Sequence, residues 1–91
     1  MRYEWDSQKN EWLKAERNVS FEKIVFHLAR GDVRKVADHP DQEAYPGQKI
    51  YFVIVEEYVC LVPHVVEKDY IFLKTIIPSR KATDIYFGGE K

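Results

Sequence analysis

A strand followed by a basic turn is encoded in the stretch Tyr70-Ile71-Phe72-Leu73-Lys74-Thr75-Ile76-Ile77-Pro78-Ser79-Arg80-Lys81-Ala82-Thr83. Its first eight residues are mostly β-branched or aromatic, which is typical of a strand. Pro78 has no backbone N–H to donate, so we expect the ladder to end there. Arg80 and Lys81 then begin a segment that we expect to form one or two helical turns. Paired cations after a strand suit an anion such as phosphate, and a solvated basic turn is the plainer alternative.

The size and composition of the chain are those of one small domain. It has 91 residues, 45% of them hydrophobic and 32% charged, with a formal net charge of −1. We therefore expect a single domain spanning residues 1–91. A net charge near zero excludes a general attraction to nucleic acid, so any RNA contact has to come from a local group of cations.

The cysteine content and the hydropathy pattern predict a soluble, cytoplasmic protein without membrane contact. The single cysteine, Cys60, lies in an apolar run, where we expect a buried structural residue in a reducing compartment. No apolar stretch of the sequence approaches the length of a membrane span. The three histidines, at positions 27, 39 and 64, have no metal-ligand spacing, so we expect neither a metal nor another cofactor.

One short strand and two helices are expected before residue 32. Arg2–Trp5 alternates polar and aromatic residues, which indicates a strand, and Asp6 is a good N-cap for a helix over Ser7–Arg17. Ser20 caps a second helix, and Gly31 ends it. The second helix carries an apolar stripe at helical spacing, formed by Phe21, Ile24, Val25 and Leu28.

The remainder of the chain predicts strands. After a strand over Val33–Asp38 comes a long loop at 39–48, followed by strands at Lys49–Glu56, Tyr58–Val66 and Tyr70–Ile77. The short connections between the last three indicate an antiparallel meander. The order β-α-α-β-β-β-β predicts an α+β fold, with two N-terminal helices packed on one face of an antiparallel sheet of about four or five strands.

The alternation of side chains in the last hairpin brings together a candidate site. If the chain turns around Lys68, Phe72 lies opposite His64, and Lys74 lies diagonally from His64. An imidazole, an aromatic ring and a cation would then share one patch near Arg80. RNA cleavage without a metal needs proton transfer and charge stabilisation at phosphorus, and aromatic rings stack on bases. These residue types are present, although they follow no specific catalytic spacing.

Two motifs at opposite ends of the chain resemble the BrnT toxin family. The stretch Glu4-Trp5-Asp6-x-x-Lys9, followed by Val19-Ser20-Phe21-Glu22, is similar to the N-terminal signature of that family. The stretch Ile76–Thr83 resembles its Ile-Ser-Ala-Arg-Lys-Ala-Thr ending. Between the motifs, Tyr45–Lys49 departs from the arginine-rich segment that is usual in the family.

The resemblance implies a RelE-like fold and a metal-independent ribonuclease of a type II toxin–antitoxin pair. A ribbon-helix-helix antitoxin, bound in a hetero-oligomer, would neutralise it. Arg80 and Lys81 match the family's terminal basic pair. The leading hypothesis is a divergent BrnT-like toxin in which Arg80 binds phosphate and His64 or Lys74 handles protons. Further phosphate contacts and base stacking are assigned to Lys49, Lys81, Tyr45, Phe72 and Tyr86.

Two rival hypotheses belong to other classes of protein. In the first, the chain is a binding module without catalysis, whose aromatic strand face and Tyr86-Phe87 contact a protein partner. The near-neutral charge favours this module, whereas the cations after Pro78 favour the enzyme. In the second, the chain is a DNA-associated protein, which the absence of a basic helix from the sequence disfavours.

Overall fold

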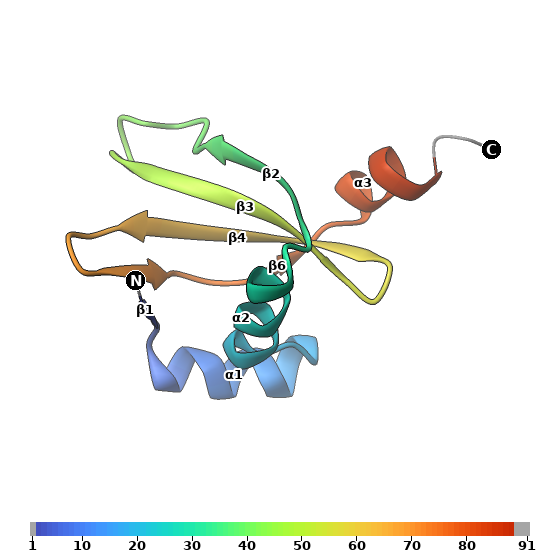
Figure 1. The fold of residues 1–91 in the computed structure, drawn as a ribbon, viewed down its shortest axis with the longest axis horizontal. Helices are drawn as coiled ribbons and strands as arrows, with labels where there is room; N and C mark the ends of the chain where they lie inside the picture. The colour runs from blue at the N-terminus through green and yellow to red at the C-terminus, as the bar shows by residue number, and fades with distance from the viewer. Residues whose placement is uncertain (1, 89–91) are drawn as a thin grey trace.

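The computed structural model describes residues 2–88, an α+β fold in which the two N-terminal helices lie on the same side of a six-stranded sheet (Figure 1). The elements in chain order are β1 (Arg2–Glu4), α1 (Ser7–Arg17), α2 (Phe21–Arg30), β2 (Val33–Asp38), β3 (Gln48–Val55), β4 (Tyr58–Val66), β5 (Tyr70–Leu73), β6 (Ile77–Pro78), α3 (Arg80–Thr83) and the π-helical η1 (Asp84–Gly88). Within residues 2–88, no helix is long and apolar enough to cross a membrane.

Both N-terminal helices begin at the predicted N-caps, and α2 ends at the predicted Gly31. The Asp6 carboxylate accepts hydrogen bonds from the first backbone N–H groups of α1, and the Ser20 hydroxyl accepts one from α2. Each cap satisfies donors that have no partner inside the helix. The helices end at Asn18 and Gly31, which adopt left-handed backbone conformations with φ of 57° and 81°.

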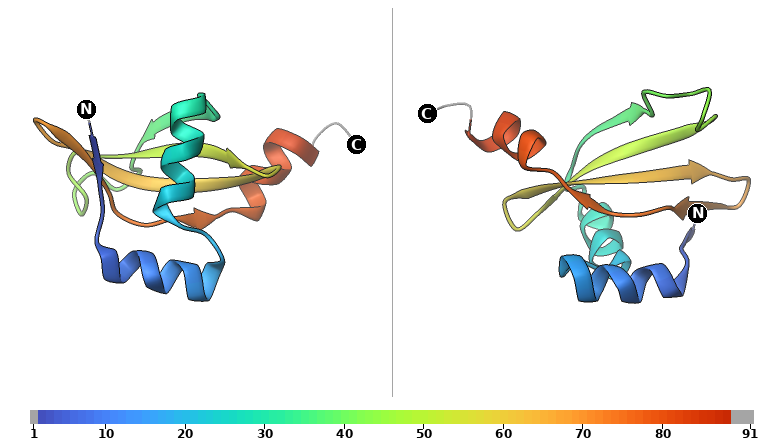
Figure 2. Two further views of the ribbon diagram at one scale, coloured as in Figure 1. Left: turned by 60° about the horizontal axis from the view of Figure 1, so that its bottom comes forward. Right: turned by 180° about the vertical axis from the view of Figure 1, so that it is seen from behind.

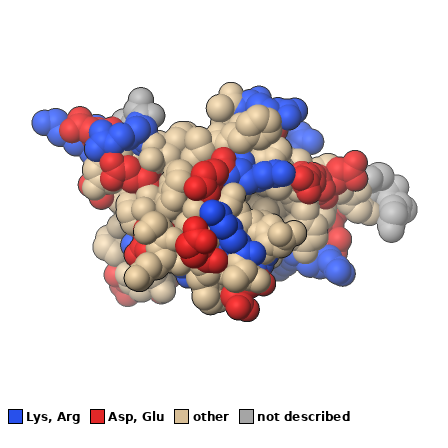
Figure 3. All heavy atoms as spheres, turned by 90° about the horizontal axis from the view of Figure 1, so that it is seen from below, with Lys and Arg blue, Asp and Glu red and all other residues tan. Residues whose placement is uncertain are grey.

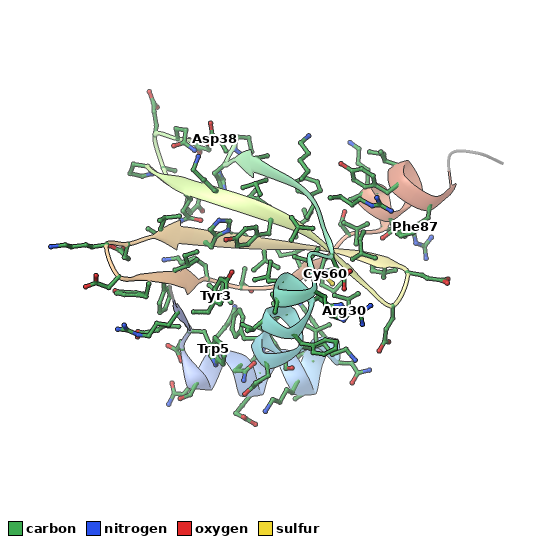
Figure 4. All side chains as sticks on the ribbon, viewed as in Figure 1. Tyr3, Trp5, Arg30, Asp38, Cys60 and Phe87 are labelled. Atoms are coloured by element: carbon green, nitrogen blue, oxygen red, sulfur yellow. The ribbon has the colours of Figure 1, made fainter. Side chains whose placement is uncertain are left out.

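The core lies between the helices and the sheet. The apolar stripe of α2 is turned inward, so Phe21 and Ile24 are buried together with Leu13 of α1. They pack against the sheet residues Val53, Val55, Cys60, Val62, Leu73 and Ile76. Trp5 stacks on Phe21 with ring centroids 5.5 Å apart, on the helical side of the sheet (Figure 4). The predicted α+β class is thus confirmed.

The sheet is mixed, so the prediction of a purely antiparallel sheet was wrong. The strand order is β1-β5-β4-β3-β2, and β6 also pairs with β4. Neighbouring strands from β2 to β5 are antiparallel, whereas β1 runs parallel to β5. The three-residue β1 pairs with the four-residue β5 and forms one edge of the sheet. No local sequence pattern encodes this pairing, because its partner lies 68 residues further along the chain (Arg2 and Tyr70).

The predicted strand Tyr70–Ile77 is interrupted after Leu73. Leu73 and Ile76 are both fully buried although they are three residues apart, which the two-residue period of a continuous strand does not allow. The chain therefore leaves the ladder and rejoins it at β6, which includes Pro78. The backbone N–H of Ser79 donates to the Val59 carbonyl at 2.9 Å, so the ladder extends one step beyond the predicted end.

A buried asparagine joins the two N-terminal helices. The Asn10 side chain in α1 is 3% exposed, and its Oδ1 accepts the backbone N–H of Phe21 at 2.8 Å. Its Nδ2 donates to Oε1 of the Glu22 carboxylate at 2.8 Å, and this bond is the main cause that lowers the pKa of Glu22. One amide therefore satisfies a buried donor at the start of α2 and links α2 to α1.

Replacing Asn10 with alanine is expected to lower the free energy of unfolding by about 1–3 kcal/mol, because the buried N–H of Phe21 loses its acceptor. Urea unfolding followed by circular dichroism measures the change. Glu22→Ala is the matched control: it removes only the exposed partner of the same amide and should cost less. Equal losses in the two variants would contradict the role assigned to the Phe21 hydrogen bond.

Candidate nucleic-acid interface

The sheet presents a second face, opposite α1 and α2, which we call the rear face. When the molecule is seen from behind, β3 and β4 lie in front of α2 (Figure 2, right). The strand registers place a set of largely apolar side chains on the rear face: Ile50, Phe52, Ile54, Leu61, Pro63, Val65, Tyr70 and Phe72. Most of them are partly exposed. β3 is therefore apolar on both of its faces, although the helices cover only one of them.

The C-terminal segment covers one end of the rear face. The backbone N–H of Val59 donates to the Thr83 hydroxyl at 2.8 Å, and Val59 and Ala82 are buried where α3 meets β4. The Tyr86 ring of η1 packs edge-on against Phe52, with centroids 6.4 Å apart. The other end of the face, around β5, lies beyond this segment (Figure 1).

Three aromatic rings of the rear face each have a cation over them. The Lys74 ammonium lies 5.8 Å from the centroid of Phe72, and the Lys35 ammonium lies 5.3 Å from that of Phe52. The third pair places the Arg2 guanidinium 5.4 Å from the centroid of Tyr70, where an ion pair between Arg2 and Glu4 offsets part of the positive charge. Rings that can stack on bases beside cations that can meet phosphates suit single-stranded nucleic acid.

The rings of Phe52 and Phe72 are further apart than the length of one nucleotide. Phe72 pairs with Val65, and Phe52 pairs with Leu61, so the rings are separated by two strand spacings and by four residues along β4. These steps correspond to roughly 17 Å. A single strand that stacks on both rings would run obliquely across Pro63 and Ile50, in the middle of the rear face.

The helical side of the molecule is different in character. Seen from below, its acidic and basic side chains are interspersed (Figure 3). Ion pairs such as Lys14–Glu11 and Lys23–Glu56 partly neutralise it. Cations also lie over two exposed rings of this side, Trp12 of α1 and Phe26 of α2. Those two rings stand on separate helices, whereas the rear-face rings lie on one continuous sheet surface.

The predicted patch of His64, Phe72 and Lys74 was wrong. His64 pairs with Leu73, and Phe72 pairs with Val65, which is one residue away from the predicted register. The backbone N–H of Glu67 donates to the Tyr70 carbonyl at 2.8 Å and closes the hairpin. The turn is therefore centred between Lys68 and Asp69, and not on Lys68. A shift of one residue moves a side chain to the opposite face of a sheet. Phe72 therefore lies on the face opposite to His64, which shares the helical side with the core residues Val62 and Leu73.

His64 is a core residue in this structure. It is 1% exposed, its ring stacks on Tyr51 with centroids 3.7 Å apart, and its Nδ1 lies 2.9 Å from the Val62 carbonyl oxygen. Burial lowers the pKa of His64, which favours the neutral imidazole. A neutral ring with a proton on Nδ1 donates to that carbonyl, so the hydrogen bond is satisfied without a charge.

The burial of His64 predicts a loss of stability as the pH falls. In the unfolded chain the imidazole takes up a proton below its ordinary pKa of about 6.5, whereas the folded chain resists protonation until a lower pH. Stability should therefore fall between pH 7 and 5, and it should fall less in His64→Phe, which keeps a ring on Tyr51. Urea unfolding at several pH values measures both slopes. Parallel slopes for the two proteins would refute the assignment.

The other predicted site residues fall into two groups. Phe72 and Lys74 lie together on the rear face, and Arg80, Lys81 and Tyr86 all belong to the C-terminal segment over one end of that face. Two residues lie elsewhere. Lys49 pairs with His64 across the ladder, on the helical side, and its ammonium is 2.8 Å from the Asp38 carboxylate. Tyr45 lies in the 39–47 loop against His39, with ring centroids 4.4 Å apart.

Sequence reasoning did not find Phe52, Lys35 or the Arg2–Tyr70 pair. A signal for Phe52 was present, because β3 is apolar in both of its alternating sets of residues and its second set needs a cover or a ligand. Lys35 lies opposite Phe52 because the β-bulge between Val33 and Lys35 shifts the register of β2 against β3. The sequence gives no signal for this bulge.

Cys60 and the acidic residues offer no further chemistry. Cys60 is buried, as predicted, and burial raises the pKa of its thiol to about 11, so it is not a thiolate at neutral pH. Within residues 2–88, no three His, Cys, Asp or Glu side chains are grouped closely enough to hold a metal ion.

Comparison with known proteins gave no relatives for this chain. No family model matches it, and searches of curated proteins and of solved structures found no match. The similarity to the BrnT family thus rests on the two terminal motifs of the sequence. The candidate interface rests on the geometry of the rear face.

Proposed function

We propose that this chain binds single-stranded RNA on its rear face and cleaves it without a metal, as the toxin of a type II toxin–antitoxin pair with a RelE-like fold. The observation that carries the proposal is the pairing of cations with rings on one sheet surface, Lys74 with Phe72 and Lys35 with Phe52. RNA-binding proteins commonly stack splayed bases on aromatic side chains while nearby cations follow the backbone.

The proposed cleavage uses two cations, Arg80 of α3 and Lys74 after β5, which act on the same phosphate. The Arg80 guanidinium holds the phosphate and stabilises the charge that builds up on phosphorus. The 2′-oxygen attacks phosphorus while its proton passes to solvent water, and Lys74 protonates the 5′-oxygen as the bond from phosphorus to that oxygen breaks. Lys81 adds a phosphate contact. Phe72 and Tyr86 stack on bases, and the buried His64 takes no part.

The proposed partner is a ribbon-helix-helix antitoxin, in keeping with the terminal motifs. It would neutralise the toxin by covering the rear face, where half-buried apolar side chains such as Ile50, Leu61 and Val65 are available to a protein partner.

The burial of His64 favours a second candidate function. With that imidazole in the core, the rear face keeps its binding residues and loses one of the two proton carriers expected from the sequence. The chain would then be a binding module that captures RNA or the antitoxin without cutting. Binding and cleavage therefore have to be measured separately.

RNA affinity should fall about 30-fold or more in Phe52→Leu/Phe72→Leu, because each lost stack is worth at least about 1 kcal/mol. Leucine keeps apolar bulk at both sites and removes the ring. Fluorescence anisotropy with a labelled single-stranded RNA of mixed sequence measures the affinity. Phe26→Leu is the matched control: it removes an exposed ring that has Arg30 over it on the helical side, and it should leave affinity unchanged. The opposite ranking would contradict the proposal.

A further inference from the structure

A pocket opens on the helical side of the molecule, away from the rear face. Its volume is about 490 Å³, within the range of small-molecule sites. It lies where the end of α1, the start of α2, the β3–β4 hairpin and β6 meet. The residues that line it are Lys14, Arg17, Asn18, Val19, Ser20, Lys23, Val55, Glu56, Tyr58, Cys60 and Pro78. Figure 4 labels Cys60 on the central strand β4.

The inner part of the pocket is apolar. Val55 is 8% exposed and Cys60 is 2% exposed, so both belong to the core and offer only a small surface to the pocket. The Cys60 thiol stays protonated at neutral pH because burial raises its pKa to about 11. Val19 and Pro78 extend the apolar lining. This part of the pocket suits the hydrocarbon body of a ligand, because apolar contact removes surface from water on both sides.

The rim of the pocket is positively charged. Three cations, Lys14, Arg17 and Lys23, line it, and Glu56 is the one carboxylate among the described lining residues. The Lys23 ammonium lies 2.7 Å from the Glu56 carboxylate, and the side chains of both are largely exposed. Exposed ion pairs of this kind contribute little free energy. A ligand anion can therefore contact Lys23 beside Glu56, or take the place of Glu56, with little loss of stability.

Arg17 is held in place before any ligand arrives. Its Nη1 donates to the Ile76 carbonyl at 2.7 Å, and its guanidinium lies 4.9 Å from the centroid of Trp12. A guanidinium carries five N–H donors in a rigid fork, and the bond to Ile76 uses one of them. The pocket lies at the C-terminal end of α1 and the N-terminal end of α2, where the partial charges of the two helix dipoles have opposite signs and offset each other. The positive charge of the rim therefore comes from its side chains.

We infer that this pocket binds a small organic anion: one carboxylate, sulfonate or phosphate group on an apolar body. The anionic group contacts Arg17 with Lys14 and Lys23, and the apolar body lies against Val55 and Cys60. This site is independent of the proposed RNA interface, since its lining comes from the helical side. It goes beyond the proposed function and does not depend on it.

The test uses the fluorescent anion 8-anilinonaphthalene-1-sulfonate and the neutral N-phenyl-1-naphthylamine, which has the same rings without the sulfonate. The anion should bind saturably with one site per chain, and at least about tenfold more tightly than the neutral dye. Lys14→Gln/Lys23→Gln should weaken binding of the anion about tenfold, because it removes two charges from the rim. The matched control Lys35→Gln/Lys74→Gln removes two charges from the rear face and should leave binding unchanged.

The amide resonances of Val19, Ser20 and Glu56 should shift on titration with the anionic dye, which locates the site. Equal affinity for the two dyes would overturn the inference, because apolar contact alone would then account for binding. A larger loss in Lys35→Gln/Lys74→Gln would also overturn it, since the dye would then occupy the rear face.

Discussion

RNA cleavage is expected to fall about a hundredfold or more when Arg80 is replaced by alanine, because one electrostatic contact to the reacting phosphate is lost. Arg80 is exposed in the first turn of α3, and the Ser79 hydroxyl caps that turn by accepting the backbone N–H of Ala82 at 3.0 Å. The cap fixes where the side chain leaves the backbone, so the loss should reflect missing charge and not a displaced helix.

Lys74→Gln should reduce cleavage by a similar factor, through the loss of the proposed proton donor to the 5′-oxygen. Both variants are assayed beside wild type on purified RNA in EDTA. Arg30→Ala and Lys68→Gln are the controls, since they remove the same charge types from the end of α2 and from the β4–β5 turn. Wild-type rates in Arg80→Ala and Lys74→Gln would remove both residues from the proposed site. A folded wild type that binds RNA without cutting it would favour the binding module.

The second large effect concerns the core. Phe21→Ala is expected to lower the free energy of unfolding by about 3–5 kcal/mol, because the phenyl ring is fully buried and stacks on Trp5. Small domains have only about 5–15 kcal/mol in total, so much of the stability would disappear.

Phe26→Ala tests whether burial is the cause of that loss. Phe26 lies on the outer side of the same helix and is 54% exposed, so its truncation should change the free energy of unfolding by no more than about 0.5 kcal/mol. Urea unfolding of the two variants gives the comparison. Similar losses for Phe21 and Phe26 would show that helix propensity dominates, which would contradict the packing described for the core.

The sequence predicts the helical layer well because its signals are local. Asp6 and Ser20 accept the N–H groups that the first helical turn leaves free, and Gly31 adopts the left-handed conformation that ends α2. The spacing of Phe21 and Ile24 then decides which side of α2 faces the sheet. Each of these effects acts within a few residues, so it can be recognised without a tertiary structure.

The sheet is harder to predict because its register depends on small differences. The β4–β5 turn is centred half a residue away from Lys68, and this difference alone puts Phe72 and Lys74 on the face opposite to His64. Leu73 and Ile76 are both drawn into the core, which breaks the expected strand. The parallel pairing of β1 with β5 has no local signature.

The candidate site was only partly predictable for the same reason. Phe72 and Lys74 remain together because they are two residues apart on one strand segment. Arg80 and Tyr86 follow them on the C-terminal segment. Phe52 depends on which face of β3 the helices leave uncovered, and that choice is made by the packing of α2.

The most direct test of an RNA interface on the rear face compares two neighbouring valines of β4. Val65 points to the rear face opposite Phe72, whereas Val66 pairs with Ile71, points to the helical side and is 51% exposed. Methyl NMR spectra are recorded while a single-stranded RNA of mixed sequence is added. We expect the Val65 methyl resonances to shift and those of Val66 to stay unchanged. Shifts at Val66 with an unchanged Val65 would contradict an RNA interface on the rear face.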